Sequence, residues 1–306
     1  MSSQTFFKVT NIIFNAFNKK DYDQALVLIG EAKREFPDRL DKTAFWEACV
    51  HSIRGEPGRA ITALTSAMEK GVWWNPVSLT RDPDLKNIQN EGSFKQVLIE
   101  CEEILEAASA HSDPSLSIYG NEESNTGIFS LHWKGSNVVD FAPYWQEEND
   151  YLLGFPQSSQ LFGPNTYCWD DIEKATKEIT DLYKDFTNQF KPKTLIVAGA
   201  SQGGRLAIEL SVDGKFEESK GFIAVIPAIQ DIQSFEILLK ANKGRIIKGC
   251  IIAGMSDPFF SRTMELKQLF DRYEIDCKWI TIEGLGHFFP QDFPDILKKA
   301  VEFIKS

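Results

Sequence analysis

Residues 199–203 read Gly-Ala-Ser-Gln-Gly and follow the apolar run 194–198, so Ser201 stands where a strand would turn into a helix. A strand running into Gly-x-Ser-x-Gly presents the serine hydroxyl as a nucleophile on a sharp, strained turn. Larger residues two positions either side would collide with the neighbouring strand or helix. Residues 204–210 have a helical pattern, and the N-terminus of that helix would stabilise negative charge beside Ser201. An ordinary strand-to-helix turn is the alternative, but the flanking strand and helix favour a nucleophile.

A serine hydroxyl needs a base, usually a histidine, and the base needs a carboxylate that orients it. On sheets of this kind, the acid follows the serine in the chain, and the histidine follows the acid. The acid is predicted to be Asp257, in the loop that leaves the apolar strand 250–254. Functional loops lie at that end of parallel strands. Asp-Pro also commonly precedes a helix, so Asp257 could cap one as well. Asp231, after the previous strand, is the reserve candidate.

The base is predicted to be His287, in the sequence Gly-Leu-Gly-His at 284–287 that follows the last strand, 279–282. The other three histidines have weaker positions. His51 lies in a helical region and His111 at its boundary, whereas His132 is expected to shape a loop rather than react.

An oxyanion formed on Ser201 needs two hydrogen-bond donors. One is predicted to be the backbone N–H of Gln202, the residue after the nucleophile. The other is expected from the loop 132–137, which follows the strand 128–131, through the backbone N–H of Lys134. Donors of this kind contribute about 3 to 4 kcal/mol of transition-state stabilisation.

The composition is that of a globular protein: 306 residues, 42% hydrophobic, 25% charged, net charge −11. A protein without a basic surplus is not expected to bind nucleic acid or anionic membranes. No apolar stretch is long enough to span a bilayer, and residues 1–8 lack the pattern of a secretory signal. The five cysteines are widely spaced without a C-x-x-C pair, which argues against a disulfide framework or a zinc site and favours a reducing cytoplasm.

Apolar residues up to about His111 recur at helical spacing. The expected helices cover residues 7–19, 21–36, 42–54, 57–70 and 93–110. Ala25 and Ala60 lie 35 positions apart, and each is followed seven residues later by another alanine. A period of about 34 residues resembles tetratricopeptide repeats, in which small residues let paired helices approach closely. An unspecialised helical bundle is the alternative.

Beyond a polar segment near residue 112 the pattern changes to short apolar strands alternating with amphipathic helices, which indicates a mostly parallel sheet with helices on both faces. The expected strands are 128–133, 151–155, 194–199, 221–227, 250–254 and 279–282, with an edge strand near 116–119. The expected helices are 170–190, 204–211, 232–241, 261–273 and 294–305. We therefore predict an α/β fold at 112–306 preceded by an all-α, tetratricopeptide-like domain at 1–111.

Residues 127–306 resemble the α/β-hydrolase fold, and within it the phospholipase/carboxylesterase group of small esterases and acyl thioesterases. The motifs that carry this resemblance are Leu-His-x-x-Gly-Ser-Asn at 131–137 with Asp140-Phe141, Pro-Gln-Ser-Ser-Gln at 156–160, Trp-Asp-Asp at 169–171, Gly-Ala-Ser-Gln-Gly-Gly at 199–204 and Gly286-His287. The family usually has glycine after the loop histidine, where this chain has Trp133. A bulky residue there could narrow the acyl site or shift the oxyanion loop.

The residues and the resemblance together predict a serine hydrolase that cleaves a carboxylic ester or thioester through an acyl-enzyme, without metal or organic cofactor. Trp133, Phe259 and Phe288 are candidates for lining the acyl pocket, although aromatic pairs usually belong to the core. Two alternatives stay open: a peptidase or amidase on the same scaffold, or a protein-binding repeat module attached to a degenerate hydrolase domain. In the latter case, the helical domain would take a peptide or protein partner.

Overall fold

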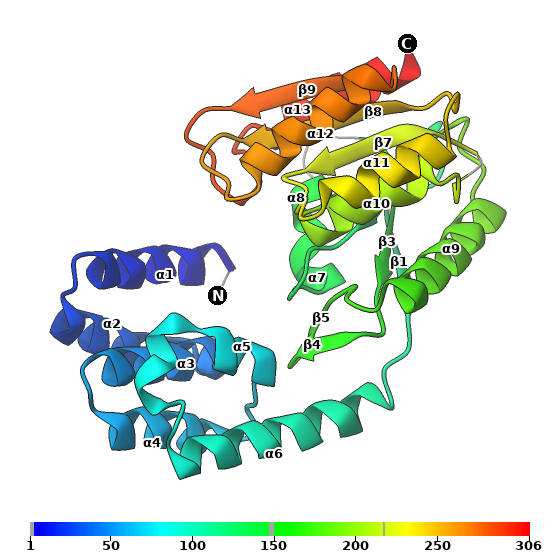
Figure 1. Ribbon diagram of the computed structural model, residues 1–306. Coiled ribbons are helices and arrows are strands. Elements are labelled where there is room, and N and C mark those ends of the chain that lie inside the picture. The colour runs from blue at the N-terminus through cyan, green and yellow to red at the C-terminus, as the bar shows by residue number, and fades with distance from the viewer. Residues whose placement is uncertain (1–2, 147–149, 217) are drawn as a thin grey trace. The chain divides into compact units, whose positions relative to one another are not determined.

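Seven strands of the described part of residues 112–306 form one sheet in the order β1-β3-β2-β6-β7-β8-β9, seen in the ribbon of the computed structural model (Figure 1). Their bounds are β1 Ser115–Gly120, β2 Thr126–Leu131, β3 Leu152–Gln157, β6 Thr194–Ala200, β7 Ser219–Val225, β8 Lys248–Gly254 and β9 Asp276–Ile282. Only β1 pairs with its neighbour in antiparallel orientation. The mostly parallel sheet and its edge strand are therefore confirmed.

The structure describes residues 3–146, 150–216 and 218–306. The chain divides into two compact units, Met1–His111 and Ser112–Ser306, which we describe separately and call the helical unit and the α/β unit. Residues 1 and 2, which belong to the segment considered for a secretory signal, lie outside the described residues. Within the described ranges no helix combines the length and apolar character needed to cross a bilayer.

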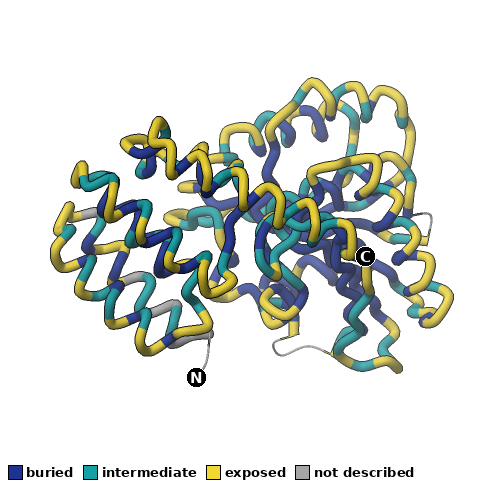
Figure 2. Tube along the Cα trace, turned by 90° about the horizontal axis from the view of Figure 1, so that it is seen from below, coloured by how far each residue is buried: buried dark blue, intermediate teal, exposed yellow. Residues whose placement is uncertain are grey.

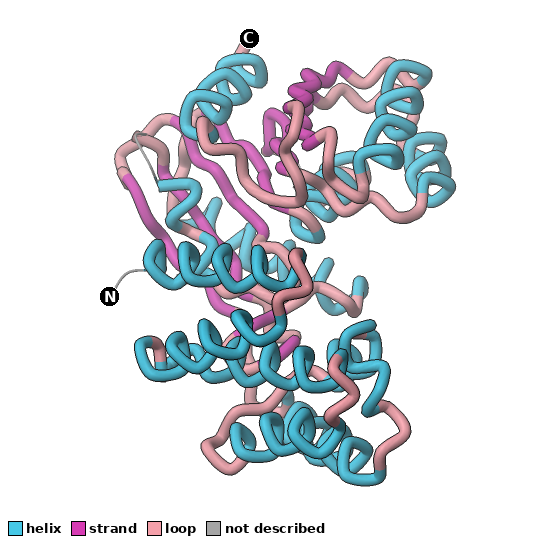
Figure 3. The backbone as a smooth tube through the Cα atoms, turned by 90° about the vertical axis from the view of Figure 1, so that its left-hand side faces the viewer, coloured by secondary structure: helices cyan, strands magenta, loops and turns pink. Residues whose placement is uncertain are grey.

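Helices cover both faces of the sheet (Figure 3). Successive side chains of a strand point to opposite faces, and here both sets are apolar, so both faces must be covered. In β6, Ile196 and Ala198 face one side, and Leu195 and Val197 face the other. The first face packs against α7 (Val138–Phe141), α8 (Pro143–Gln146) and α13 (Phe293–Lys305). The second packs against α9 (Ile172–Gln189), α10 (Gln202–Val212), α11 (Ile232–Ala241) and α12 (Phe260–Arg272). The central strands are accordingly buried along their length (Figure 2).

The helical unit contains α1 Ser3–Asn18, α2 Tyr22–Glu35, α3 Leu40–Ile53, α4 Pro57–Met68, α5 Pro76–Arg81 and α6 Gly92–Ser109, with 3-10 helices at Pro37–Arg39 and Pro83–Ile88. Helices thus occupy the ranges expected from the sequence. The repeated alanines Ala25 and Ala60 are both fully buried, as helices in close contact require. The resemblance to tetratricopeptide repeats stays a prediction.

Short elements depart from the sequence-based expectation. The strand expected at 128–133 ends at Leu131, because His132 and the residues after it leave the sheet as a loop. Helices α5, α7 and α8 were not expected, nor was the antiparallel pair of β4 (Leu161–Gly163) and β5 (Thr166–Tyr167). Elements of two to six residues are too short to show a hydrophobic period, which explains why the pattern did not reveal them.

Candidate active site

Ser201 lies on the turn between β6 and α10 in a backbone conformation that non-glycine residues rarely adopt, with φ 53° and ψ −116°. The turn is tight because its glycines touch backbone. A Cβ atom on Gly199 would stand 2.5 Å from the carbonyl of Gly203, and one on Gly203 would stand 2.3 Å from the carbonyl oxygen of Leu131. The N–H of Ser201 donates to the carbonyl of Val225 in β7 at 2.9 Å. Main-chain packing therefore holds the serine at the carboxyl end of the sheet.

The structure brings Ser201, His287 and Asp257 into one line of hydrogen bonds. The distance from His287 Nε2 to Ser201 Oγ is 2.7 Å, and the distance from His287 Nδ1 to Asp257 Oδ2 is also 2.7 Å. The Asp257 side chain is 4% exposed and that of His287 is 30% exposed, so the carboxylate is shielded while the imidazole reaches the surface. This geometry allows the imidazole to take a proton from the hydroxyl while the carboxylate orients it.

Asp257 also stabilises the turn that precedes α12. Its Oδ1 accepts the N–H of Phe259 at 2.8 Å, while Oδ2 contacts the imidazole. One oxygen of the carboxylate thus holds the turn and the other contacts the imidazole. The N-cap of α12 is Phe259, so Asp257 lies before the helix and does not cap it, and its role beside the histidine stays a prediction. The reserve candidate Asp231 caps α11 instead, where its carboxylate accepts the N–H groups of Gln233 and Ser234.

The loops that carry Asp257 and His287 are joined to each other. The N–H of Met255 donates to the carbonyl of Ile282, and the N–H of Ser256 donates to the carbonyl of Leu285, both at 2.9 Å. A Cβ atom on Gly254 would stand 2.3 Å from the carbonyl oxygen of Leu285, so only glycine allows this approach. The extensions of β8 and β9 thus continue the parallel pairing of the two strands into the site.

His132 is fully buried in the loop 132–137, which we call the oxyanion loop after the role predicted for it. Its Nδ1 lies 2.9 Å from the carbonyl oxygen of Trp133, and its Nε2 lies 3.3 Å from the backbone nitrogen of Ser158. This arrangement assigns the proton to Nδ1, so that Nε2 accepts the N–H of Ser158. Burial lowers the pKa of His132 to about 4, which keeps the ring neutral. The indole N–H of Trp169 donates to the carbonyl of His132 at 3.0 Å. These contacts fit the loop-shaping role expected of His132.

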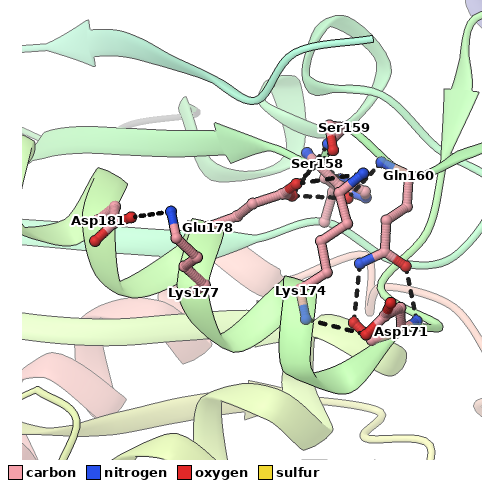
Figure 4. A network of polar contacts seen from close by, with 9 residues as sticks. Ser158, Ser159, Gln160, Asp171, Lys174, Lys177, Glu178 and Asp181 are labelled. Carbon is pink, nitrogen blue, oxygen red and sulfur yellow. Dashed lines mark hydrogen bonds and ion pairs between the residues drawn. The ribbon is translucent and has the colours of Figure 1, made fainter. Parts of the chain in front are cut away.

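A buried carboxylate fixes the segment that carries Ser158 (Figure 4). Glu178 of α9 accepts the hydroxyl and the N–H of Ser159, the latter at 3.2 Å, and lies 3.9 Å from the ammonium of Lys174. The side-chain amide of Gln160 pairs with the backbone of Asp171 through bonds of 3.0 and 2.7 Å. The segment 156–160, whose Ser158 N–H bonds His132, is therefore held in place by Glu178 and by the backbone of Asp171.

The two residues predicted to supply the oxyanion donors, Gln202 and Lys134, lie on two separate elements. Gln202 is the first residue of α10, where backbone N–H groups have no partner within the helix. Lys134 lies in the oxyanion loop. Their side chains meet on one carboxylate, since Asp170 Oδ2 lies 2.5 Å from Lys134 Nζ and Asp170 Oδ1 lies 2.8 Å from Gln202 Nε2. Sequence reasoning quoted Asp170 within a motif but gave it no role. The assignment of the two backbone donors stays a prediction.

The proposed pocket residues fall into two places. The Trp133 ring packs against those of Tyr144, Phe288 and Phe289, with centroid distances of 5.4, 6.1 and 5.6 Å. Phe259 instead stacks obliquely on the imidazole of His287, at 5.2 Å. Phe289 is buried in the core, whereas Phe288 is 41% exposed. Trp133 and Phe288 therefore share one aromatic cluster, and Phe259 lies beside His287. That these residues bind an acyl group stays a prediction.

One group of potential metal ligands occurs among the described residues, in the helical unit. Donor atoms of Cys49, Asp82 and Asp84 lie within 4.8 Å of one another. Burial, with a smaller contribution from the two carboxylates, raises the pKa of the Cys49 thiol far above its ordinary value. Acidic side chains often lie close together without an ion between them, so we assign no metal to this cluster.

Scans of the sequence against protein-family models and curated proteins gave no match. Among solved structures, an uncharacterized protein from Bacillus cereus ATCC 10987 is similar over 98% of this chain and 99% of its own, with 25% identity and a TM-score of 0.56. Esterase PE8 matches 63% of this chain and 99% of its own, with 20% identity and a TM-score of 0.53. Acyl-protein thioesterase 2 from Zea mays matches 62% and 99%, with 13% identity and a TM-score of 0.50. The α/β unit therefore has the α/β-hydrolase fold.

Proposed function

We propose that this protein is a serine hydrolase that cleaves a carboxylic ester or thioester. The observation that carries the proposal is the hydrogen-bond line from Asp257 through His287 to Ser201, with 2.7 Å at each contact of the imidazole. The esterase and thioesterase named among the similar structures support this class of substrate.

In the proposed mechanism Ser201 Oγ attacks the acyl carbon while His287 Nε2 takes the hydroxyl proton. Asp257 accepts the N–H at Nδ1 and stabilises the imidazolium that forms. The backbone N–H groups of Gln202 and Lys134 hold the oxyanion of the tetrahedral intermediate. Collapse of this intermediate breaks the bond to the alcohol or thiol, which leaves with the proton from His287. Water, activated by the same imidazole, then releases the acid from Ser201, so the cycle needs no metal or organic cofactor.

Several finer assignments belong to the same proposal. Trp133, Phe259 and Phe288 contact an apolar acyl group, because Trp133 lies in the oxyanion loop against Phe288 and Phe259 lies beside the base. The helical unit takes a peptide or protein partner, as its resemblance to tetratricopeptide repeats suggests. A cytoplasmic location is supported by five cysteines that are all free.

The test is labelling with a fluorophosphonate followed by mass spectrometry, together with turnover of nitrophenyl esters and an acyl thioester. We expect the label on Ser201, no turnover by Ser201→Ala, and a loss of roughly 10⁴-fold in kcat for Asp257→Asn, because the imidazole would then lose its orienting carboxylate. Ser261→Ala, at an exposed serine of α12, is the matched control and should behave as wild type. A well-folded protein that is labelled elsewhere, or a Ser201→Ala variant with undiminished turnover, would refute the proposal.

Aminoacyl amides in the same assay separate ester from amide cleavage. We expect esters and thioesters to be turned over and amides to be left intact. Faster cleavage of the amides would replace the esterase with a peptidase on the same residues.

A further inference from the structure

Asp170 joins the two residues whose backbone N–H groups are proposed to hold the oxyanion. Its carboxylate accepts the ammonium of Lys134 on one oxygen and the side-chain amide of Gln202 on the other. Lys134 comes from the oxyanion loop after β2, and Gln202 from the helix after β6. One carboxylate thus spans the two separate elements that must act together on a single oxygen atom.

The chain around Asp170 makes the same connection. We call residues 167–170 the connecting segment. The N–H of Gly135 donates to the carbonyl of Tyr167 at 2.8 Å, and the N–H of Tyr167 donates to the carbonyl of Ser136 at 2.7 Å. The N–H of Trp169 donates to the side-chain oxygen of Gln202 at 3.0 Å. The segment is therefore bonded to the oxyanion loop at one end and to the first residue of α10 at the other.

We propose that Asp170 is a positioning residue that fixes the spacing between the backbone N–H groups of Lys134 and Gln202. The inference rests on the proposed hydrolase function and deepens it. Donors stabilise an oxyanion only when both lie at hydrogen-bond distance from the place where the charge develops, and a displacement of about 1 Å can reduce the rate by roughly 100-fold. A single carboxylate bonded to both side chains limits such displacement.

The ion pair between Lys134 and Asp170 is as exposed as an ordinary surface pair. Its loss should therefore affect the positions of the two donors without much effect on folding stability. The side chains of Lys134 and Asp170 are 41% and 51% exposed. Pairs of this kind contribute little to folding stability. Burial raises the pKa of Asp170, but the hydrogen bonds from Lys134 and Gln202 outweigh it and hold the pKa below its ordinary value, so the carboxylate is charged at neutral pH. The Lys134 side chain makes a second contact, a cation–π interaction in which its ammonium lies 4.9 Å from the centre of the Phe162 ring.

The experiment compares Asp170→Asn, Lys134→Met and the double variant. Asn keeps an acceptor for the Gln202 amide but loses the charge that holds Lys134. We expect kcat for a nitrophenyl ester to fall roughly 10-fold with KM changed less than about 2-fold, because the donors act on the transition state. The double variant should be no worse than the worse single variant, because the two substitutions remove one shared contact.

A second readout uses a trifluoromethyl ketone, which forms a tetrahedral adduct with the serine. Its inhibition constant should rise in proportion to the loss of kcat/KM in Asp170→Asn, because the adduct uses the same donors. The melting temperature should stay within about 3 °C of wild type, because a surface pair contributes little to stability.

The chain offers a matched control on α9, where Lys177 and Asp181 form an ion pair of 3.0 Å with Asp181 52% exposed (Figure 4). Asp181→Asn removes the same charge at the same exposure, and should leave kcat, KM and inhibitor affinity unchanged.

Two results separate the inference from the function on which it rests. In the first, wild type is active and Ser201→Ala is not, while Asp170→Asn keeps the wild-type kcat or changes only KM. The positioning role is then overturned and the hydrolase stands. If Ser201→Ala is as active as wild type, the proposed function itself fails, and the inference with it.

Discussion

The turn that carries Ser201 and the oxyanion loop adjoin each other but are held by different means. At Ser201 the constraint is main chain against main chain, exerted by Gly199 and Gly203, which are neighbours of the serine in sequence. The oxyanion loop is held by side chains that come from distant segments, through His132 to Ser158 and through Lys134 to Asp170. The turn should therefore tolerate almost no change in its own residues, whereas the loop should respond gradually to changes elsewhere.

The largest effect is expected from Gly203→Ala. The new Cβ would lie 2.3 Å from the carbonyl oxygen of Leu131 and 2.6 Å from that of His132, so the backbone of the turn must move. We expect a loss of about 3 kcal/mol or more in the free energy of unfolding and loss of fluorophosphonate labelling, measured by urea titration and mass spectrometry.

Gly286→Ala is the control for this comparison. A Cβ atom at Gly286 meets nothing within 4 Å, although the residue adjoins the proposed base. We expect a change of at most about 0.5 kcal/mol. Equal losses in the two variants would show that the turn is no more constrained than its surroundings.

The next effect is a pH dependence of stability that comes from His132. Its pKa is about 4 in the folded protein and 6.5 for a free histidine, so the unfolded chain binds the proton more strongly. The stability contributed by the neutral ring is complete above pH 6.5 and is lost as the pH falls towards 4. From the pKa difference we expect a loss of about 2.5 kcal/mol between pH 8 and pH 4.5 that His132→Gln does not show.

Urea titrations of both proteins at pH 8, 6 and 4.5 measure this difference. His132→Gln keeps an acceptor for the N–H of Ser158, and groups elsewhere in the chain cancel in the comparison. Parallel curves for wild type and variant would mean that His132 titrates as an exposed residue, and that the loop is held less tightly than its contacts indicate.

The smallest effect is expected from Trp133→Ala. The ring is half-buried against Tyr144 and Phe288, and its removal should cost about 2 kcal/mol of stability. Because the change opens space in the aromatic cluster, we expect nitrophenyl esters of longer acyl chains to be accepted, while kcat for the acetate ester stays within about 3-fold. Phe303→Ala, at a half-buried aromatic residue of α13, should lose stability without changing the preferred chain length. An unchanged preference in Trp133→Ala would remove this residue from the acyl site.

The same contrast explains what the sequence could reveal. The α/β-hydrolase sheet was predictable because its strands and helices carry their own hydrophobic periods, and Ser201 because its turn is encoded within five consecutive residues. Asp257 and His287 could be proposed because each lies in a loop that leaves the carboxyl end of a predicted strand, and because they follow Ser201 in the order acid, then histidine. The contact of Asp170 with Lys134 and Gln202 joins residues 36 and 32 positions apart on two loops and the start of a helix, and the burial of Glu178 beneath Ser159 depends on how α9 lies on the sheet. Such contacts exist only after folding.

The bonds between the two loops beyond β8 and β9 have a mechanical consequence. Because Met255 and Ser256 are bonded to the backbone at Ile282 and Leu285, the loops that carry the carboxylate and the imidazole are expected to move together. The serine lies on a separate turn after β6, so a relative displacement of the two parts should lengthen the contact between Nε2 and the serine oxygen before that between Nδ1 and the carboxylate. In the proposed cycle, such a displacement would interrupt proton transfer while the acid and the base stay paired.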